Sequence, residues 1–454
     1  MAVYYPVFWI FYVNQTSPFI GNIVWHIYVY LLAFCGVAAL YGFLRDTGNQ
    51  FKAAALAVSL YFFTPRMFAE SHYNNKDMIL LSLTLCIFYC GYKLYQDPSW
   101  KHILAFSLVG SLAANLKVVG IFIWGAFGGF IFCGMLFRHS FNRRMLAKVL
   151  MCIALAASLY IFLTPASWTG LGEFFRYLVE NARNFRWNDY ILFAGSMYNK
   201  STTGMPRRYL PVMILLTIPI GILILSLIGL ISILFSLFKK PFRPFGCTGV
   251  TCVAVLICLL PLGYAVLTAT PVYNGWRHFY FCYASITILS AYGVSFLLSL
   301  FRKYKRERWA ERVLGIYVLL LAAGIFFNYP YEYAYYNLIA GRQIEDTYEL
   351  DYWDMSFKQA YEIILKDSPE NNISVGTITN PSRWGLDAQL DAIRGKQRMR
   401  ITLCENWKDA QYLIINPMYA YMYGQEDYNW IRQNYELLES LSSYGNILCE
   451  IYRR

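Results

Sequence analysis

Four ionisable side chains fall within the eleven-residue stretch FAESHYNNKDM, residues 68–78, and apolar segments flank it on both sides. The four residues are Glu70, His72, Lys76 and Asp77. Asp77 lies where the second apolar segment begins, and Asn74 or Asn75 is a plausible cap for a helix starting there. A helix start carries free N–H groups and a partial positive charge, which favour a carboxylate or a phosphate. The stretch therefore offers groups for acid–base chemistry, although an Asp that only satisfies the helix dipole is the simpler alternative.

A second group of charges lies in PVYNGWRHFYF, residues 271–281, where Arg277 and His278 enter an apolar segment. Charges at such a depth are costly and usually face a cavity or a partner. The guanidinium fork suits bidentate contacts with phosphate. The alternative to phosphate binding is that Arg277 and His278 only anchor the segment at the membrane interface, within a belt of aromatic residues.

Three further cations lie beside apolar segments. Lys117, in AANLKVVG, has no acid near it in the sequence. It either reaches the lipid headgroups or points into the cavity that Arg277 and His278 would face. Arg207 and Arg208 precede the apolar segment LPVMILLTIPIG. We treat all three as candidate phosphate-binding residues.

The composition indicates a membrane protein. The chain is 57% hydrophobic and 15% charged, whereas soluble proteins average about a quarter charged. Its mean hydropathy is +0.38. The formal net charge of +12 does not indicate a nucleic-acid partner, because the basic residues lie in short runs between apolar segments. Membrane lipids are the expected surroundings.

The apolar segments predict ten membrane spans, since about 20 apolar residues cross a bilayer. The predicted spans are 22–44, 51–66, 77–95, 102–117, 119–137, 145–164, 210–237, 248–268, 279–300 and 313–328. The basic loops RHSFNRR, KKPFR and RKYKRERWAER are expected to be cytoplasmic by the positive-inside rule. The alternating loops and the tail then face outward: 66–76, 165–209, 269–278 and the residues from about 329.

The tail has a different composition and predicts a small α/β domain. Strand-like runs (NISVGTI, AQYLIIN, ILCEIY) alternate with helical stretches (SFKQAYEIILKD, YNWIRQNYELLESL). Cys404 and Cys449 could pair if the tail is exported. The expected fold is a polytopic α-helical membrane domain, 1–328, with a small extracytoplasmic α/β domain, 329–454. A docking or acceptor-binding role fits the tail, which has no Gly-rich phosphate loop or metal-ligand spacing.

Several stretches, in order, resemble one family. LYFFTPRMFAESHYNNKDMILL resembles the Pro-Arg…His…Asn-x-Lys-Asp segment of bacterial GT-C glycosyltransferases of the protein-mannosyltransferase-like group, glycosyltransferase family 39. NDYILFAG…MPRRYLPVMILLTIPIG and PVYNGWRHFYF look like that family's later loop-to-helix entries. YPYEYAYYNLIAG…YELDYWDMSFKQA resembles the segment after its last helix. The resemblance covers nearly all of the chain beyond residue 50.

The resemblance implies an integral membrane transferase of the bacterial inner membrane. Such enzymes move a sugar from a polyprenyl-phosphate carrier to a glycan, lipid or protein acceptor on the outer face, typically with inversion. A carboxylate acts as general base, while cations or a metal stabilise the departing phosphate. By resemblance, Asp77 and His72 would line the cavity, Arg277 and His278 would approach the phosphate, and Lys117 matches a Lys at a similar hairpin. Lys76 belongs to the same phosphate-binding set.

The chain departs from the family pattern at its start. The family's catalytic acid usually lies in a first outer loop, and no Asp-Glu pair occurs before Asp77. Either the first helix and its loop are missing, or Glu70 serves as the base. Residues 1–21 are then a re-entrant or interfacial segment, or the part that follows a missing helix. A divalent metal on Glu70, His72 and Asp77 is conceivable without diagnostic spacing. A transporter or flippase of an anionic lipid-linked substrate, or a non-catalytic scaffold, are the alternatives to an enzyme.

Overall fold

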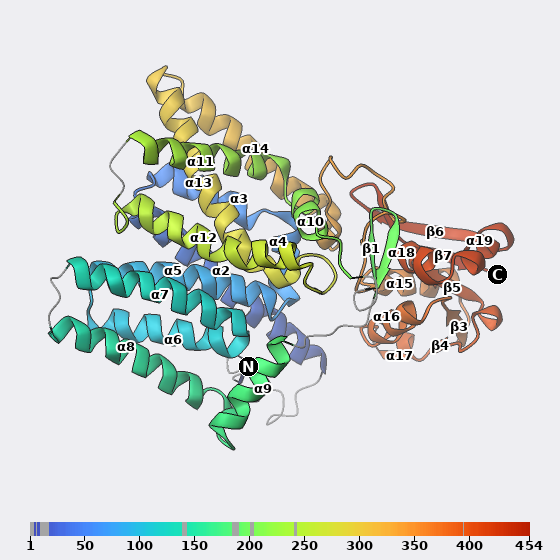
Figure 1. Ribbon diagram of the computed structural model, residues 1–454. Coiled ribbons are helices and arrows are strands. Elements are labelled where there is room, and N and C mark those ends of the chain that lie inside the picture. Colours follow the sequence, from blue (N-terminus) through green and yellow to red (C-terminus); the bar gives the residue numbers. More distant parts are fainter. Residues whose placement is uncertain are drawn as a thin grey trace. The chain divides into compact units, whose positions relative to one another are not determined.

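The computed structural model describes residues 4–5, 7–9, 18–138, 143–183, 190–199, 204–239, 243–393 and 395–454 (Figure 1). Most of the predicted N-terminal segment before residue 18, and most of the basic loop RHSFNRR, lie outside these residues. Contacts divide the chain into two compact units. The membrane unit comprises Met1–Arg186, Ile218–Thr270 and Trp276–Ala323, and the sheet unit comprises Trp187–Thr217, Pro271–Gly275 and Gly324–Arg454.

The membrane unit is built from helices. They are α2 (Pro18–Asp46), α3 (Phe51–Phe62), α4 (Pro65–Tyr73), α5 (Asp77–Gln96), α6 (Trp100–Leu116), α7 (Val118–Arg138), α8 (Arg143–Phe162), α9 (Leu171–Arg183), α11 (Ile220–Lys239), α12 (Cys247–Thr268), α13 (Tyr283–Lys303) and most of α14 (Glu307–Asn328). All of them except α4 and α9 are apolar. A short 3₁₀ helix, η3 (Arg277–Cys282), leads into α13. Helix α5, which begins at Asp77, packs against α2, α6 and α7 (Figure 1).

Among the described residues, eight helices are long and apolar enough to cross a membrane. Each of the ten predicted spans overlaps at least one helix, but α3 has only 12 residues and α6 only 17. Pro65 starts α4 directly after α3, and Lys117 interrupts the hairpin between α6 and α7. The predicted span 210–237 begins as a separate helix, α10 (Tyr209–Thr217), because Pro219 cannot continue its hydrogen-bond ladder. The predicted fold class, a polytopic helical membrane protein with a small C-terminal sheet domain, is confirmed.

Two glycines allow α11 and α13 to approach closely. A Cβ atom on Gly229 would lie 1.8 Å from the carbonyl oxygen of Leu289, and one on Gly293 would lie 2.0 Å from that of Leu225. Small residues at helix crossings let backbones meet in a membrane, where apolar burial drives association little. This crossing therefore depends on the absence of side chains.

The sheet unit contains two sheets. The hairpin of β1 (Tyr190–Phe193) and β2 (Ser196–Asn199) forms one. The other has the order β4-β3-β5-β7-β6, in which β3 is parallel to β4 and β5 while β7 is antiparallel to β5 and β6. Its strands are β3 (Ile373–Gly376), β4 (Ile401–Leu403), β5 (Tyr412–Ile415), β6 (Glu436–Ser443) and β7 (Asn446–Arg453), and the unit's other helices are α15 (Phe357–Asp367), α16 (Asn380–Leu390), α17 (Gly395–Arg398), α18 (Pro417–Tyr423) and α19 (Gln425–Asn434).

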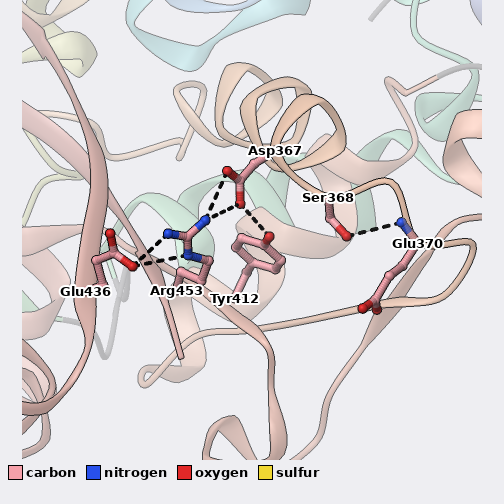
Figure 2. Close-up of polar contacts among 6 residues, drawn as sticks. All are labelled: Asp367, Ser368, Glu370, Tyr412, Glu436 and Arg453. Atoms are coloured by element: carbon pink, nitrogen blue, oxygen red, sulfur yellow. Dashed lines mark hydrogen bonds and ion pairs between the residues drawn. The ribbon is translucent and has the colours of Figure 1, made fainter.

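Helices cover both faces of the five-stranded sheet. Ile414 packs in one hydrophobic cluster with residues of α15 and α16, and its neighbours Leu413 and Ile415 pack in another with residues of α18 and α19. Alternate side chains of a strand point to opposite faces, which explains why every residue of β5 is buried. Figure 2 shows that Arg453 of β7 contacts Asp367 at the end of α15 and Glu436 of β6. Arg453 therefore links a helix that covers the sheet to the edge strand β6.

One expectation for the tail is wrong. The helix predicted over YNWIRQNYELLESL ends at Asn434, and Glu436–Ser443 forms the edge strand β6. The reason is the two-residue turn Tyr444-Gly445, in which both residues have positive φ, so β6 folds back onto β7 as a hairpin. The sequence left open a pairing of Cys404 with Cys449; both are free thiols, and they pack against different hydrophobic clusters.

Candidate functional site

Two buried carboxylates of the membrane unit are joined by one amide side chain. Glu70 lies on α4 and Asp77 begins α5, and both are buried. The Asn74 side-chain nitrogen donates to Glu70 Oε2 at 2.7 Å and to Asp77 Oδ2 at 3.2 Å. Asn74 follows Glu70 by four residues, which is one helical turn, and precedes Asp77 by three. Its position at the end of α4 therefore lets it reach both acids.

The same Asn74 side chain also orders the start of α5. Its oxygen accepts hydrogen bonds from the backbone nitrogens of Asp77 at 2.9 Å and Lys76 at 3.2 Å. These bonds satisfy donors that a helix start leaves without an intrahelical acceptor. The N-cap position of α5 is Lys76, not Asn74 or Asn75 as predicted, but it is Asn74 that accepts the hydrogen bonds there and fixes the position of Asp77 relative to Glu70.

Lys117 forms an ion pair with Asp77. It is the extended residue between α6 and α7, and its ammonium group donates to Asp77 Oδ1. The hairpin is tight: a Cβ atom on Gly120 would lie 2.2 Å from the carbonyl oxygen of Ala113. A glycine at this position lets Lys117 sit at the tip of the hairpin while α6 and α7 both pack on α5.

Glu70 accepts a hydrogen bond from a phenol and lies in the field of two guanidinium groups. The Tyr280 hydroxyl, on η3, donates to Glu70 Oε1 at 3.1 Å. Burial raises the pKa of the Glu70 carboxyl, while the Asn74 hydrogen bond and the charges of Arg277 and Arg66 lower that pKa; the net shift is upward. A carboxylate with a raised pKa is the better proton acceptor near neutral pH.

The structure brings some of the predicted site residues together and leaves others apart. Glu70, Asp77, Lys117 and Arg277 form the polar cluster just described, which we call the α4–α5 cluster, together with Arg66, Asn74 and Tyr280. His278 follows Arg277 on η3 and is half-buried. Lys76 is exposed, and the hydrogen bond from it to Asn74 is made by its backbone.

His72 packs against α2 instead of joining the carboxylates. Its ring stacks on Tyr30 with the centroids 4.6 Å apart, and its Nδ1 lies 2.9 Å from the Phe68 carbonyl oxygen. Burial lowers the pKa of His72. His72 lies two residues after Glu70, which turns it to a different face of α4.

Arg207 and Arg208 belong to the sheet unit. Both are exposed just before α10, and the Arg208 guanidinium lies 5.7 Å from the centre of the Phe193 ring. Within the same unit, the Glu349 carboxylate accepts hydrogen bonds from the Tyr209 hydroxyl at 3.1 Å, from the Gly275 nitrogen at 3.2 Å and from the Asn274 side chain. Three of the sequence stretches that carry the family resemblance therefore meet at Glu349.

Among the residues that the structure describes, no three His, Cys, Asp or Glu side chains lie close enough to hold a metal ion. The two cluster carboxylates already bind Asn74, Lys117 and Tyr280. The divalent metal considered from the sequence therefore has no ligand set within this described part of the chain.

The sequence interpretation missed three members of the α4–α5 cluster as site residues. Asn74 had a signal, since it is four residues from Glu70 and three from Asp77. Arg66 lies in the Pro-Arg motif at the start of α4 and is buried, which a sequence does not reveal. Tyr280 is 210 residues from Glu70 in the sequence. The two residues meet only because η3 packs on α5, next to α4.

A buried polar cluster among apolar helices, eight of them long enough to cross a membrane among the described residues, defines an integral membrane protein. Residues 10–168 match the family model described as dolichyl-phosphate-mannose-protein mannosyltransferase. This range contains most of the α4–α5 cluster. The match confirms the predicted resemblance to the GT-C superfamily and supports a glycosyltransferase of that type.

Two solved structures are similar to the chain. One is the crystal structure of ArnT from Cupriavidus metallidurans bound to undecaprenyl phosphate, with 11% sequence identity and a TM-score of 0.42. The other is the same protein in the apo state, with 12% identity and a TM-score of 0.42. Each likeness covers 94% of this chain and 83% of the other. No curated protein matches the chain.

Proposed function

We propose that the chain is a glycosyltransferase that moves a sugar from a polyprenyl-phosphate carrier to an acceptor hydroxyl on the extracytoplasmic face of the bacterial inner membrane. The observation that carries this proposal is the α4–α5 cluster. Its buried carboxylate, Glu70, and Arg66 lie within the range that matches the mannosyltransferase model, and Arg277 joins them from outside that range. The predicted topology places the loop 66–76, and with it the cluster, on the outer face. The acceptor is a glycan, a lipid or a protein.

Glu70 is the proposed general base. It takes the proton of the acceptor hydroxyl as that oxygen forms a bond to the anomeric carbon of the sugar. The bond from this carbon to the carrier phosphate breaks, and the phosphate leaves with the electron pair. Attack opposite to the leaving group inverts the anomeric centre. A buried base with a raised pKa suits proton removal near neutral pH.

Cations near Glu70 are the proposed partners of the phosphate. Arg277 and His278 lie on η3, and Arg277 is close enough for its charge to lower the pKa of Glu70. A guanidinium stabilises the charge that develops on a leaving phosphate. Asp77 and Asn74 hold Lys117 and Glu70 in place. His72 is left out of the reaction because its ring contacts Tyr30 and Phe68.

Release of carrier phosphate tests the proposal. Purified full-length protein in liposomes is given polyprenyl-phosphate sugars and a membrane extract as the source of acceptors, and free carrier phosphate is measured. We expect Glu70→Gln to abolish release, whereas Glu173→Gln, an exposed residue of α9, leaves it unchanged. We expect Arg277→Ala to raise the donor concentration needed for half-maximal rate. The acid limb of the pH–rate profile should lie above the ordinary range of a glutamate, because Glu70 has a raised pKa.

Two results would contradict the proposal. Full release by Glu70→Gln would remove Glu70 from the mechanism. Movement of a labelled donor across the bilayer without any release of phosphate would instead indicate a transporter. The same liposomes report both results when the label is a fluorescent donor that an added quencher reaches from one side only.

A further inference from the structure

A groove lies on the membrane unit where α13 ends and α14 begins. It has a volume of about 620 Å³, within the range of about 300–1,000 Å³ usual for small-molecule sites. The residues that line it are Leu297, Phe301, Arg306, Trp309, Ala310, Val313 and Leu314. Six of the seven are apolar or aromatic, so the groove is an apolar channel with a single charged group.

The turn between the two helices puts that charge next to the apolar wall. Lys305 has a φ of 55°, its nitrogen donates to the Arg302 carbonyl, and the Arg306 nitrogen donates to the Phe301 carbonyl at 2.8 Å. This is the Schellman pattern of a helix end, in which the residue at the Arg306 position is often apolar and packs on the residue at the Phe301 position. Here an arginine stands beside Phe301 instead.

Two nearby cations are neutralised by acids, whereas Arg306 is the basic residue that lines the groove. Arg302 pairs with Glu307, and Lys52 pairs with Glu311 at 2.5 Å. Among the residues that the structure describes, Arg306 forms no ion pair with an acid. The exposed Trp309 indole lies on the same groove, as expected where a helix meets the headgroup layer.

We propose that this groove binds an anionic phospholipid, with an acyl chain along the apolar wall and the lipid phosphate on the Arg306 guanidinium. An apolar channel alone would accept any acyl chain, so Arg306 supplies the preference for a negative headgroup. Basic pockets between membrane helices on the cytoplasmic side bind anionic headgroups, and the run RKYKRER places this turn on the predicted cytoplasmic face. The site is thus separate from the proposed donor site and does not depend on the proposed transferase activity.

Native mass spectrometry of the full chain in detergent tests this site. The protein is incubated with phosphatidylglycerol and phosphatidylcholine of identical acyl chains, and the lipids retained per chain are counted. We expect wild type to retain phosphatidylglycerol in preference. Arg306→Gln should lower that preference about fivefold, since one basic side chain contributes about 1 kcal/mol to anionic-lipid binding. Arg308→Gln, which changes an exposed arginine of the same run outside the groove, should leave it unchanged.

A second variant tests the apolar wall. Val313 is exposed and lines the groove, so Val313→Trp fills the channel without disturbing a buried position. It should lower retention of both lipids. Equal retention by wild type and Arg306→Gln, or an equal loss in Arg308→Gln, would overturn the proposal. Displacement of phosphatidylglycerol by equimolar polyprenyl phosphate would overturn it as well, because the groove would then be a carrier site.

Discussion

Replacing Lys117 with methionine is expected to destabilise the membrane unit by about 2–4 kcal/mol. The Lys117 and Asp77 side chains are 23% and 9% exposed. Methionine keeps most of the side-chain volume but leaves the Asp77 carboxylate without its cation. Removing one partner of a buried pair costs about 3–5 kcal/mol, and we take a lower figure because Lys117 reaches solvent and Asn74 still donates to Asp77.

The ion pair of Lys93 with Asp46 is the matched control. Its atoms are 2.9 Å apart and its side chains are 34% and 27% exposed. Pairs as exposed as this contribute about 0–1 kcal/mol, so Lys93→Met should cost far less than Lys117→Met. Both lysines lie in the membrane unit, and both substitutions remove one positive charge.

A double-mutant cycle isolates the interaction of Lys117 with Asp77. Asp77→Asn removes the charge that Lys117→Met leaves buried, so the double variant should be more stable than Lys117→Met alone. Reversible unfolding of the full chain in mixed micelles, by titration with sodium dodecyl sulfate, gives the free energies of unfolding. Equal losses for Lys117→Met and Lys93→Met, or no recovery in the double variant, would refute the reasoning.

Three further predictions concern single positions. Asn74→Ala should lower turnover about 10- to 100-fold, because hydrogen bonds to charged groups contribute about 1.5–3 kcal/mol. Asn75→Ala is the control. Equal turnover in the two variants would contradict the role of Asn74 as a bridge between Glu70 and Asp77. Burial and a neighbouring aspartate raise the pKa of Asp354 well above its ordinary value, so its contribution to stability is present below its unfolded pKa and lost as pH rises through the folded pKa. Asp354→Asn removes this titration, and asparagine tolerates the φ of 48° that residue 354 adopts. The substitution should therefore flatten the pH dependence of hydrogen exchange in the five-stranded sheet. An unchanged pH dependence would contradict this role of Asp354. Gly229→Ala should lower the free energy of unfolding by about 1–3 kcal/mol, because its methyl group meets α13 at the crossing with α11. Gly315→Ala meets no atom within 4 Å and should be neutral or slightly stabilising. Thermal unfolding in detergent measures both effects.

The elements of the membrane unit were largely predictable. Apolar runs of about 20 residues leave few alternatives to a helix, so each predicted span overlaps at least one. The break at Lys117 was predicted, between the spans 102–117 and 119–137, and it lies between α6 and α7. The break before Pro219 was missed, because it lies inside an otherwise apolar stretch in which α10 ends at Thr217. The edge strand Glu436–Ser443 was missed, since its pattern of three leucines suits a helix and only the Tyr444-Gly445 turn decides in favour of a hairpin.

Within the site, local spacing predicted some contacts and long-range packing decided the others. Asn74 reaches Glu70 and Asp77 because the three residues lie within two helical turns of one another. Helical spacing turns His72 to a different face of α4 from Glu70. The packing of α4 on α2 then decides that His72 stacks on Tyr30.

Taken alone, the sequence determined the environment of this protein, the helical class of its larger part and the family it resembles, because hydrophobicity and motif order are properties of the linear chain. Only the tertiary structure decided which charges meet. Lys117 lies 40 residues from Asp77 and pairs with it because the α6–α7 hairpin packs on α5. Buried charges must find partners, and when those partners lie far apart in the sequence, the packing of helices selects them.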